Sequence, residues 1–212
     1  MGKIYLIRHG QSVGNLNRQM LGHTDLPLTE FGQIQAELTA KALASVEIAA
    51  VYSSDLIRAK STAEPHARMR GFEVVSDVRL REIYLGQWEC ASLDDLLRDN
   101  SDLFLDGWRK NFGTFTPPDG ESVVDAGKRL YAAILSIARM HKDENLIIAS
   151  HAAAIRSFWG VITDTPPCDL ADTYPYPTNA SYSVISFEDD KLVPVEYSVD
   201  GHLGEYRTAL PA

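Results

Sequence analysis

A histidine flanked by an arginine and a glycine ends the first apolar run of this chain. The run from Lys3 to Ile7 is followed by Arg8, His9 and Gly10. Its apolar character predicts a buried strand, with the polar residues at the carboxyl end, where open α/β sheets bind ligands. An imidazole can attack phosphorus, and a guanidinium beside it can bind phosphate oxygens. A buried or capping histidine is the simpler alternative, so this pair needs partners elsewhere in the chain.

Two later segments repeat this order of strand, polar residue and helix. Ala50 to Ser53 predicts a second strand, and Ser54 to Ile57 predicts a capped helix start that places Arg58 in the first turn. A guanidinium at that position can bind a phosphate bidentately, with help from the positive end of the helix. Asn145 to Ala149 predicts a third strand, and His151 stands between it and a helical segment.

A single carboxylate, Glu82, stands in a loop of bulky apolar residues. Tyr84, Leu85 and Trp88 follow it closely. Apolar surroundings raise the pKa of a carboxyl group, as a general acid working near neutral pH requires.

Four ordered motifs together resemble the histidine phosphatase superfamily, in its phosphoglycerate mutase-like branch. They are LIRHGQSVGN, SSDLIRAKSTA, LREIYLGQWE and SHAAAIR, and the likeness extends to TNASYSVI near the end of the chain. The resemblance implies that His9 is the nucleophile that becomes phosphohistidine, and that Glu82 gives and takes the proton. It also implies a phosphate pocket formed by Arg8, Arg58 and His151.

The resemblance further indicates substrate contacts beyond the phosphate. One residue matches the asparagine that ends the first motif, two match a loop that touches substrate in relatives, one adjoins that loop, and one follows the second histidine. These residues are Asn15, Leu21, Gly22, His23 and Ala152.

The chain departs from the family pattern in two of its motifs. Relatives usually carry two glycines after the second histidine, whereas Ala152 and Ala153 stand there in this chain. Alanine keeps the backbone N–H groups but adds a methyl group that can crowd a ligand. Cys90 stands where a glycine usually follows the WE pair, and we interpret it as a packing residue.

Alternation of strands and helices predicts the fold class. We expect an α/β three-layer sandwich, with a mostly parallel central sheet and helices on both faces. Tyr182 to Phe187 and Leu192 to Tyr197 read as a terminal hairpin. Residues 1–212 are interpreted as one domain, and the aromatic-rich segment 88–121 as a small inserted helical cap. The alternative for that segment is a side helix that only packs; if it is a cap, its aromatic residues set the substrate preference.

Two of the expected helices have recognisable starts. Thr29 is the predicted N-cap of a helix whose apolar stripe is Ile34, Leu38, Ala42 and Leu43. Ser122 is the predicted N-cap of another, whose stripe is Leu130, Ile134 and Ile137.

Composition favours one globular enzyme domain. The chain has 212 residues, of which 45% are hydrophobic, and a net charge of −9, which makes nucleic acid and anionic membranes unfavourable partners. Cys90 and Cys168 form no CxxC pattern, so we expect reduced thiols and a cytoplasmic location. The start MGKIYLIR lacks the apolar core of a signal peptide, and no run reaches the ~18 residues of a membrane span.

The six histidines show no metal-binding spacing, so we expect neither a metal nor another cofactor. His66 and His141 are expected at the surface or at helix ends, and His202 in solvent.

Three functional hypotheses follow from the sequence. The first is a metal-independent phosphomonoesterase acting on small phosphate esters, and the second is a cofactor-dependent phosphoglycerate mutase. The third is a non-catalytic module that binds phosphorylated ligands, which would need neither the nucleophile His9 nor the acid Glu82. The substrate and the oligomeric state stay open, with a homodimer as one possibility.

Overall fold

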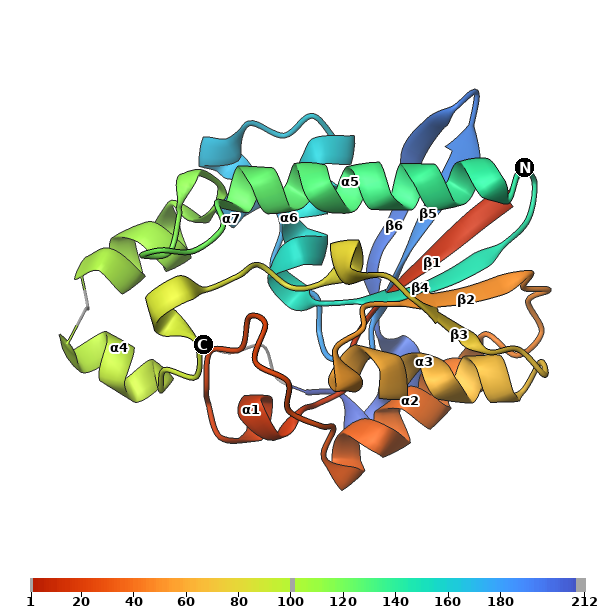
Figure 1. The fold of residues 1–212 in the computed structure, drawn as a ribbon, viewed down its shortest axis with the longest axis horizontal. Coiled ribbons are helices and arrows are strands. Elements are labelled where there is room, and N and C mark those ends of the chain that lie inside the picture. The colour runs from red at the N-terminus through yellow and green to blue at the C-terminus, as the bar shows by residue number, and fades with distance from the viewer. Residues whose placement is uncertain (1, 100–101, 209–212) are drawn as a thin grey trace.

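The computed structural model describes residues 2–99 and 102–208, which form a six-stranded sheet of order β3-β2-β4-β1-β5-β6 (Figure 1). The strands are β1 (Gly2–Arg8), β2 (Ala50–Ser53), β3 (Val74–Ser76), β4 (Leu146–Ser150), β5 (Tyr182–Glu188) and β6 (Lys191–Val199). The strands β3, β2, β4 and β1 are parallel, whereas β5 and β6 form an antiparallel hairpin at one edge. The mostly parallel sheet and the terminal hairpin are therefore confirmed.

Helices cover both faces of this sheet, α5 and α6 on one and α2 and α3 on the other (Figure 1). The helices are α1 (Val13–Leu16), α2 (Glu30–Ala42), α3 (Ile57–Arg68), α4 (Leu93–Asp99), α5 (Val123–Met140), α6 (Ala152–Ile162) and α7 (Leu170–Thr173). Short 3₁₀ segments are η1 (Val78–Leu80), η2 (Gly86–Trp88), η4 (Phe112–Thr114), η5 (Pro167–Asp169) and η6 (Gly201–Tyr206), and η3 (Leu103–Lys110) is a π-helix. The predicted three-layer α/β architecture is confirmed.

The central strands are buried on both faces, as their continuous apolar sequences predict. Leu146 and Ile148 of β4 belong to the core beneath α5 and α6, whereas Ile147 and Ala149 face the core that includes residues of α3. Ser122 caps α5 by accepting a hydrogen bond from the N–H of Asp125, and its predicted stripe, Leu130, Ile134 and Ile137, is buried.

The apolar stripe predicted for α2 is largely wrong, and only Leu43 at its end is fully buried. Thr29 caps this helix as expected, but Ile34 is 41% exposed, and the buried face instead carries small and polar residues. Gln35 accepts a hydrogen bond from the N–H of Gln11 and donates one to the carbonyl of Tyr206. Helix α2 packs against α3 and η6, and the polar side chains of its buried face form hydrogen bonds with backbone groups of nearby segments.

The start of α3 is capped from a distance. Its N-cap residue is Leu56, not Ser54 or Asp55, and Leu56 has no capping side chain. The N–H of Ile57 instead donates to Oδ1 of Asp25, at 2.7 Å. A carboxylate from another loop therefore caps the first turn of α3, where the sequence predicted a cap from a neighbouring residue.

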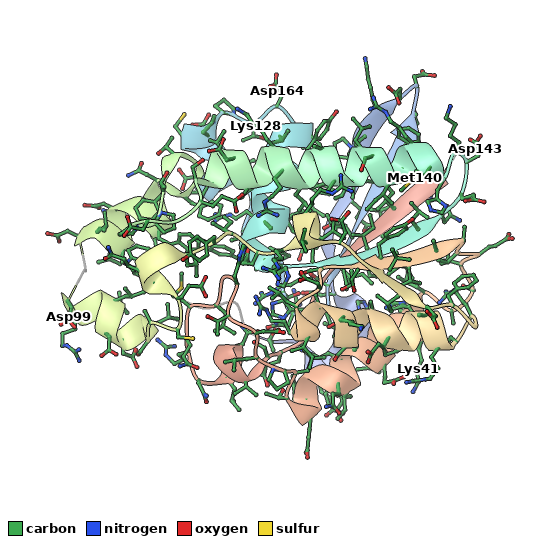
Figure 2. The ribbon with its side chains drawn as sticks, viewed as in Figure 1. Lys41, Asp99, Lys128, Met140, Asp143 and Asp164 are labelled. Atoms are coloured by element: carbon green, nitrogen blue, oxygen red, sulfur yellow. The ribbon has the colours of Figure 1, made fainter. Side chains whose placement is uncertain are left out.

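The described residues of segment 88–121, which are 88–99 and 102–121, contribute to an apolar cluster at the end of the molecule that carries α4 (Figure 1). Its aromatic side chains pack against one another; they are Trp88, Phe104, Trp108, Phe112 and Phe115. Figure 2 places Asp99, at the end of α4, and Asp143, beyond α5, at opposite ends of the molecule. The role of segment 88–121 as an inserted cap that governs substrate access stays a prediction.

None of the helices formed by residues 2–99 and 102–208 combines the length and the apolar character that crossing a bilayer requires.

Two histidines are more buried than their sequence context indicates. His66 lies in α3 with no exposed surface, and neither ring nitrogen has a hydrogen-bond partner among the described residues. His202 is half-buried, and its Nε2 shares a hydrogen bond with the hydroxyl of Thr39, at 2.9 Å. His66 does lie in the last turn of α3, but the alternative of a surface position is wrong for it, and the expectation that His202 is solvated is also wrong. His141 does lie at a helix end, as the C-cap of α5.

His66 is expected to make the fold sensitive to acid. Burial, with smaller effects from Arg70 and His202, lowers the pKa of His66 to about 3. The pKa of His66 is lower in the folded than in the unfolded protein, so acid favours unfolding. The free energy of unfolding is therefore unaffected by His66 above about pH 6.5 and decreases as the pH falls toward 3. At pH 4.5 the loss is about 2–3 kcal/mol relative to pH 7, from roughly two pKa units. Urea unfolding of the wild type and of His66→Leu at both pH values measures it, and equal acid losses would contradict the assignment.

Candidate active site

The carboxyl ends of β1 and β4 bring two histidines together. Arg8 lies opposite Ser150 in the parallel register, and the N–H of His9 donates to the carbonyl of Ser150, at 3.0 Å. The rings of His9 and His151, which directly follow the two strands, have centroids 5.2 Å apart. Because β2 is the other neighbour of β4, Arg58 in the first turn of α3 joins the same edge of the sheet.

His9 is held with one ring nitrogen free. Its Nδ1 lies 2.7 Å from the carbonyl oxygen of Gly10, which can only accept, so Nδ1 carries the proton and Nε2 keeps its lone pair. Burial, then Arg58 and Arg8, holds the pKa of His9 well below its usual value, which keeps the ring neutral. A Cβ at Gly10 would lie 2.5 Å from the carbonyl oxygen of Gly32, so this turn requires glycine. His9 therefore presents a nucleophilic nitrogen.

Two buried guanidinium groups lie beside His9 with no carboxylate partner among the described residues. Arg8 donates from Nη1 to the carbonyl of Pro177, at 2.6 Å, and Arg58 donates to the carbonyls of Gly22 and Thr24, at 2.7 and 2.8 Å. The Nε atoms of both arginines are buried and have no hydrogen-bond partner in the part of the chain that the structure describes. Burial lowers the pKa of Arg8 to about 10, so it remains charged at neutral pH. Desolvated cations without a counterion favour a bound anion.

His151 is fully buried, and both of its ring nitrogens lack a protein partner among residues 2–99 and 102–208. Burial and the charge of Arg58 hold the pKa of His151 well below its usual value. His151 is therefore neutral in the ligand-free protein. A phosphate dianion would supply the missing acceptor and favour protonation.

Glu82 lies at the amino-terminal end of α6. Its carboxylate accepts hydrogen bonds from the N–H groups of Ile83, Ala153 and Ala154, at 2.9, 3.0 and 2.7 Å. Burial raises the pKa of Glu82, against the opposing effects of these N–H groups and of Arg58. The expected direction of the shift is found; of the three apolar neighbours named from the sequence, Leu85 and Trp88 are buried, whereas Tyr84 is 42% exposed.

These groups surround a cavity of about 500 Å³. Arg8, His9 and Glu82 line it directly, whereas Arg58 and His151 do not. Its other lining residues are Gln11, Ser12, Asn15, Arg18, Gln19, Met20, Leu21, Leu85, Leu93, Phe104, Trp108, Arg109, Ala152, Ala153, Tyr176, Asn179 and Thr208.

The substrate-contact candidates divide into two groups. Asn15, Leu21 and Ala152 line the cavity, as a contact role requires. Gly22 and His23 do not line it, because their polar atoms are directed to other residues of the site. The Gly22 carbonyl accepts from Arg58, and Nε2 of His23 donates to the carbonyl of Glu82, at 3.0 Å.

The structure adds residues that the sequence did not indicate. Asn179 donates from Nδ2 to the carbonyl of His9 and to Oδ1 of Asn15, at 3.2 and 3.0 Å. Arg18, Arg109 and Tyr176 line the cavity beyond the histidines. Asn179 belongs to the segment TNASYSVI that the family likeness covers, but it precedes a strand, so the pattern of polar residues after strands did not single it out.

Comparison with known proteins identifies the family. Residues 4–200 match the histidine phosphatase superfamily (branch 1). The chain belongs to this superfamily. A probable phosphoglycerate mutase, GpmB of Yersinia enterocolitica, is 33% identical over 171 residues, which are 79% of this chain and 77% of the relative.

Several solved protein structures have the same fold as this chain. Bacillus stearothermophilus YhfR is 32% identical, with a TM-score of 0.89 over 96% of this chain and 100% of that one. A mycobacterial glucosyl-3-phosphoglycerate phosphatase in complex with VO3 is 26% identical, with a TM-score of 0.87 over 94% of this chain and 100% of that one. Phosphatases and a probable mutase are thus both similar to this histidine phosphatase superfamily chain.

Proposed function

We propose that this chain is a metal-independent phosphomonoesterase that hydrolyses small phosphorylated metabolites through a phosphohistidine intermediate. The observation that carries the proposal is the free Nε2 of His9 beside two buried guanidinium groups, Arg8 and Arg58, that lack carboxylate partners within residues 2–99 and 102–208. The same part of the chain contains no group of three His, Cys, Asp or Glu residues that could hold a metal ion, and metal independence stays a prediction.

The first step transfers the phosphoryl group to the enzyme. Arg8 and Arg58 neutralise the phosphate oxygens, and His151 joins them when the dianion raises its pKa. Nε2 of His9 then attacks phosphorus in line, and the bond from phosphorus to the leaving oxygen breaks. Protonated Glu82 gives its proton to that oxygen, so the alcohol leaves neutral.

The second step returns the enzyme to its starting state. Ionised Glu82 takes a proton from water, whose oxygen attacks phosphorus as the bond to Nε2 breaks. The raised pKa of Glu82 suits both halves of this cycle, because the carboxyl group must exist in both protonation states near neutral pH.

Cavity size supports a phosphatase over a phosphoglycerate mutase. The cavity of about 500 Å³ lies within the ~300–1,000 Å³ of pockets that enclose drug-sized ligands, so a three-carbon phosphoglycerate would fill only part of it. Phe104 and Trp108 also line it, and we propose that these aromatic side chains set a preference for the leaving group. The mutase remains the second candidate because of the relative named a probable phosphoglycerate mutase.

Water is expected to be the normal phosphoryl acceptor. The enzyme, in EDTA, is supplied with 3-phosphoglycerate and a trace of 2,3-bisphosphoglycerate, and 2-phosphoglycerate and inorganic phosphate are followed together. A parallel panel of phosphorylated metabolites, scored as kcat/KM, identifies the preferred leaving group. We expect phosphate release to dominate for every substrate that reacts.

Isomerisation faster than phosphate release by about tenfold, which is 1.4 kcal/mol of selectivity, would make the chain a mutase. Activity that disappears in EDTA and returns with Mg²⁺ or Zn²⁺ would contradict metal independence.

A further inference from the structure

We propose that Glu89 is a positioning residue for the phosphate-binding guanidinium of Arg58, and that it acts through the backbone of residues 22–24. The inference rests on the proposed function, since it concerns how strongly Arg58 binds the phosphate. Glu89 does not line the cavity. Its effect on the reaction must therefore pass through the residues that it holds.

The carboxylate of Glu89 fastens the 22–24 loop at several points. Oε1 accepts from the N–H of His23 at 2.8 Å, and Oε2 accepts from the N–H and the hydroxyl of Thr24 at 2.9 and 2.6 Å. Oε1 also accepts from the N–H of Leu85, at 3.2 Å. One side chain thus joins the loop that follows Glu82 to the loop that precedes α2.

The carbonyl groups of that same loop hold Arg58. Nη2 donates to the carbonyl of Gly22 at 2.7 Å, and Nη1 donates to the carbonyl of Thr24 at 2.8 Å. The planar guanidinium is therefore gripped at both terminal nitrogens, which fixes its plane as well as its position. Its buried Nε has no protein partner among the described residues, although Arg58 itself does not line the cavity.

Gly22 fits between the two charged groups because it lacks a side chain. A Cβ at this position would lie 2.1 Å from Oε1 of Glu89 and 2.6 Å from the carbonyl oxygen of Ile83. The loop and the carboxylate are therefore packed in direct contact, so a displacement of one moves the other.

The same loop also reaches Glu82. Nε2 of His23 donates to the Glu82 carbonyl, at 3.0 Å, so the loop contacts the segments of both the phosphate-binding arginine and the acid. Burial opposes ionisation of Glu89, but hydrogen bonds from Thr24, His23 and Leu85 outweigh it and hold the pKa of the carboxyl group below its usual value. Glu89 therefore remains an anion at the pH values where the reaction is expected to run.

A double-mutant cycle tests this inference. Glu89→Gln, Arg58→Met and the double variant are compared for kcat/KM on p-nitrophenyl phosphate and for affinity toward inorganic phosphate. Glu89→Gln keeps the side-chain shape but turns an amide N–H toward the loop donors. In the wild-type background it should lower kcat/KM by roughly 10- to 100-fold, the cost of misplacing a binding group by about 1 Å. In the Arg58→Met background the same substitution should change little, because the group that it positions is gone.

The pH profile gives a second readout. The charge of Arg58 lowers the pKa of His9, so displacing Arg58 should move the acidic limb of kcat/KM to higher pH in both Glu89→Gln and Arg58→Met. Glu37→Gln is the control, because it removes a carboxylate paired with Arg68, away from this loop. Thr24→Val, which deletes only the hydroxyl donor to Glu89, is the milder variant if Glu89→Gln does not fold.

Equal losses from Glu89→Gln with and without Arg58, or an unshifted acidic limb, would overturn the assignment. Failure of the proposed function looks different, because the wild type would then turn over no phosphomonoester. Phosphate affinity decides the inference in that case, and wild-type affinity in Glu89→Gln would overturn it.

Discussion

Replacing His9 with alanine is expected to abolish the phosphoenzyme and to lower kcat by at least ~10³, as loss of a nucleophile generally does. The reason is structural as well as chemical. His9 presents an unprotonated Nε2 because its Nδ1 proton is held by the Gly10 carbonyl, whereas His151 has neither nitrogen held by the protein within residues 2–99 and 102–208. The second histidine therefore lacks the bond that would orient it for attack.

The intermediate identifies itself by its stability. Enzyme quenched during turnover of a labelled phosphate ester should carry a label that survives alkali and is released by acid, the behaviour of a phosphoramidate. His141→Ala is the matched control, because His141 lies at the end of α5, bonded to Tyr52 and Glu144. A phosphoenzyme that still forms in His9→Ala would refute the assignment of the nucleophile.

Glu82→Gln is expected to have the second largest effect, and the effect should depend on the leaving group. With an alkyl phosphate the loss should be on the order of 10²–10⁴, the usual contribution of a positioned acid. With p-nitrophenyl phosphate, phosphoenzyme formation should suffer much less, because the leaving group departs as a stable anion. Rapid-quench measurement of phosphoenzyme formation separates this step from the hydrolysis that follows.

The pH dependence should follow the same assignments. Activity with alkyl phosphates requires protonated Glu82 and neutral His9. We therefore expect kcat/KM to decrease when the pH is raised above the pKa of Glu82, and also when the pH is lowered below the pKa of His9. Burial raises the pKa of Glu82 and lowers the pKa of His9. Both shifts widen the pH range in which Glu82 is protonated while His9 is neutral. The basic limb should disappear in Glu82→Gln.

Equal losses in phosphoenzyme formation with alkyl phosphate and p-nitrophenyl phosphate would contradict the acid role of Glu82. The carboxylate would then act by capping the first N–H groups of α6 rather than by protonating the leaving oxygen.

The sequence alone determined the fold class and the placement of most chemically important groups. Apolar runs identified β1, β2 and β4, and parallel neighbours end at one edge of a sheet, so polar residues after these strands must gather there. Arg8, His9 and His151 were located in this way, and Arg58 followed from the helix after β2. Their catalytic roles remain predictions, because placement alone does not establish chemistry.

Groups that approach this edge from the opposite direction had no such signal. Strand β5 is antiparallel to β1, with Tyr182 opposite Ile7, so the residues before β5 reach the same edge as the residues after β1. Asn179 contacts the His9 carbonyl for this reason. Strand direction is set by pairing between distant segments, which local periodicity does not encode.

Tertiary structure also decided which side chains satisfy the backbone and hold the cations. Asp25 caps α3, Glu82 caps α6, and Glu89 fastens the loop that grips Arg58, each from a distant segment of the chain. Local capping rules fail at α3 and α6 because a helix end needs an acceptor, whichever part of the chain supplies it. Short-range patterns in the sequence therefore predict the order of strands and helices. Burial and long-range hydrogen bonds, which depend on the tertiary structure, determine the charge state and the orientation of the side chains on those elements.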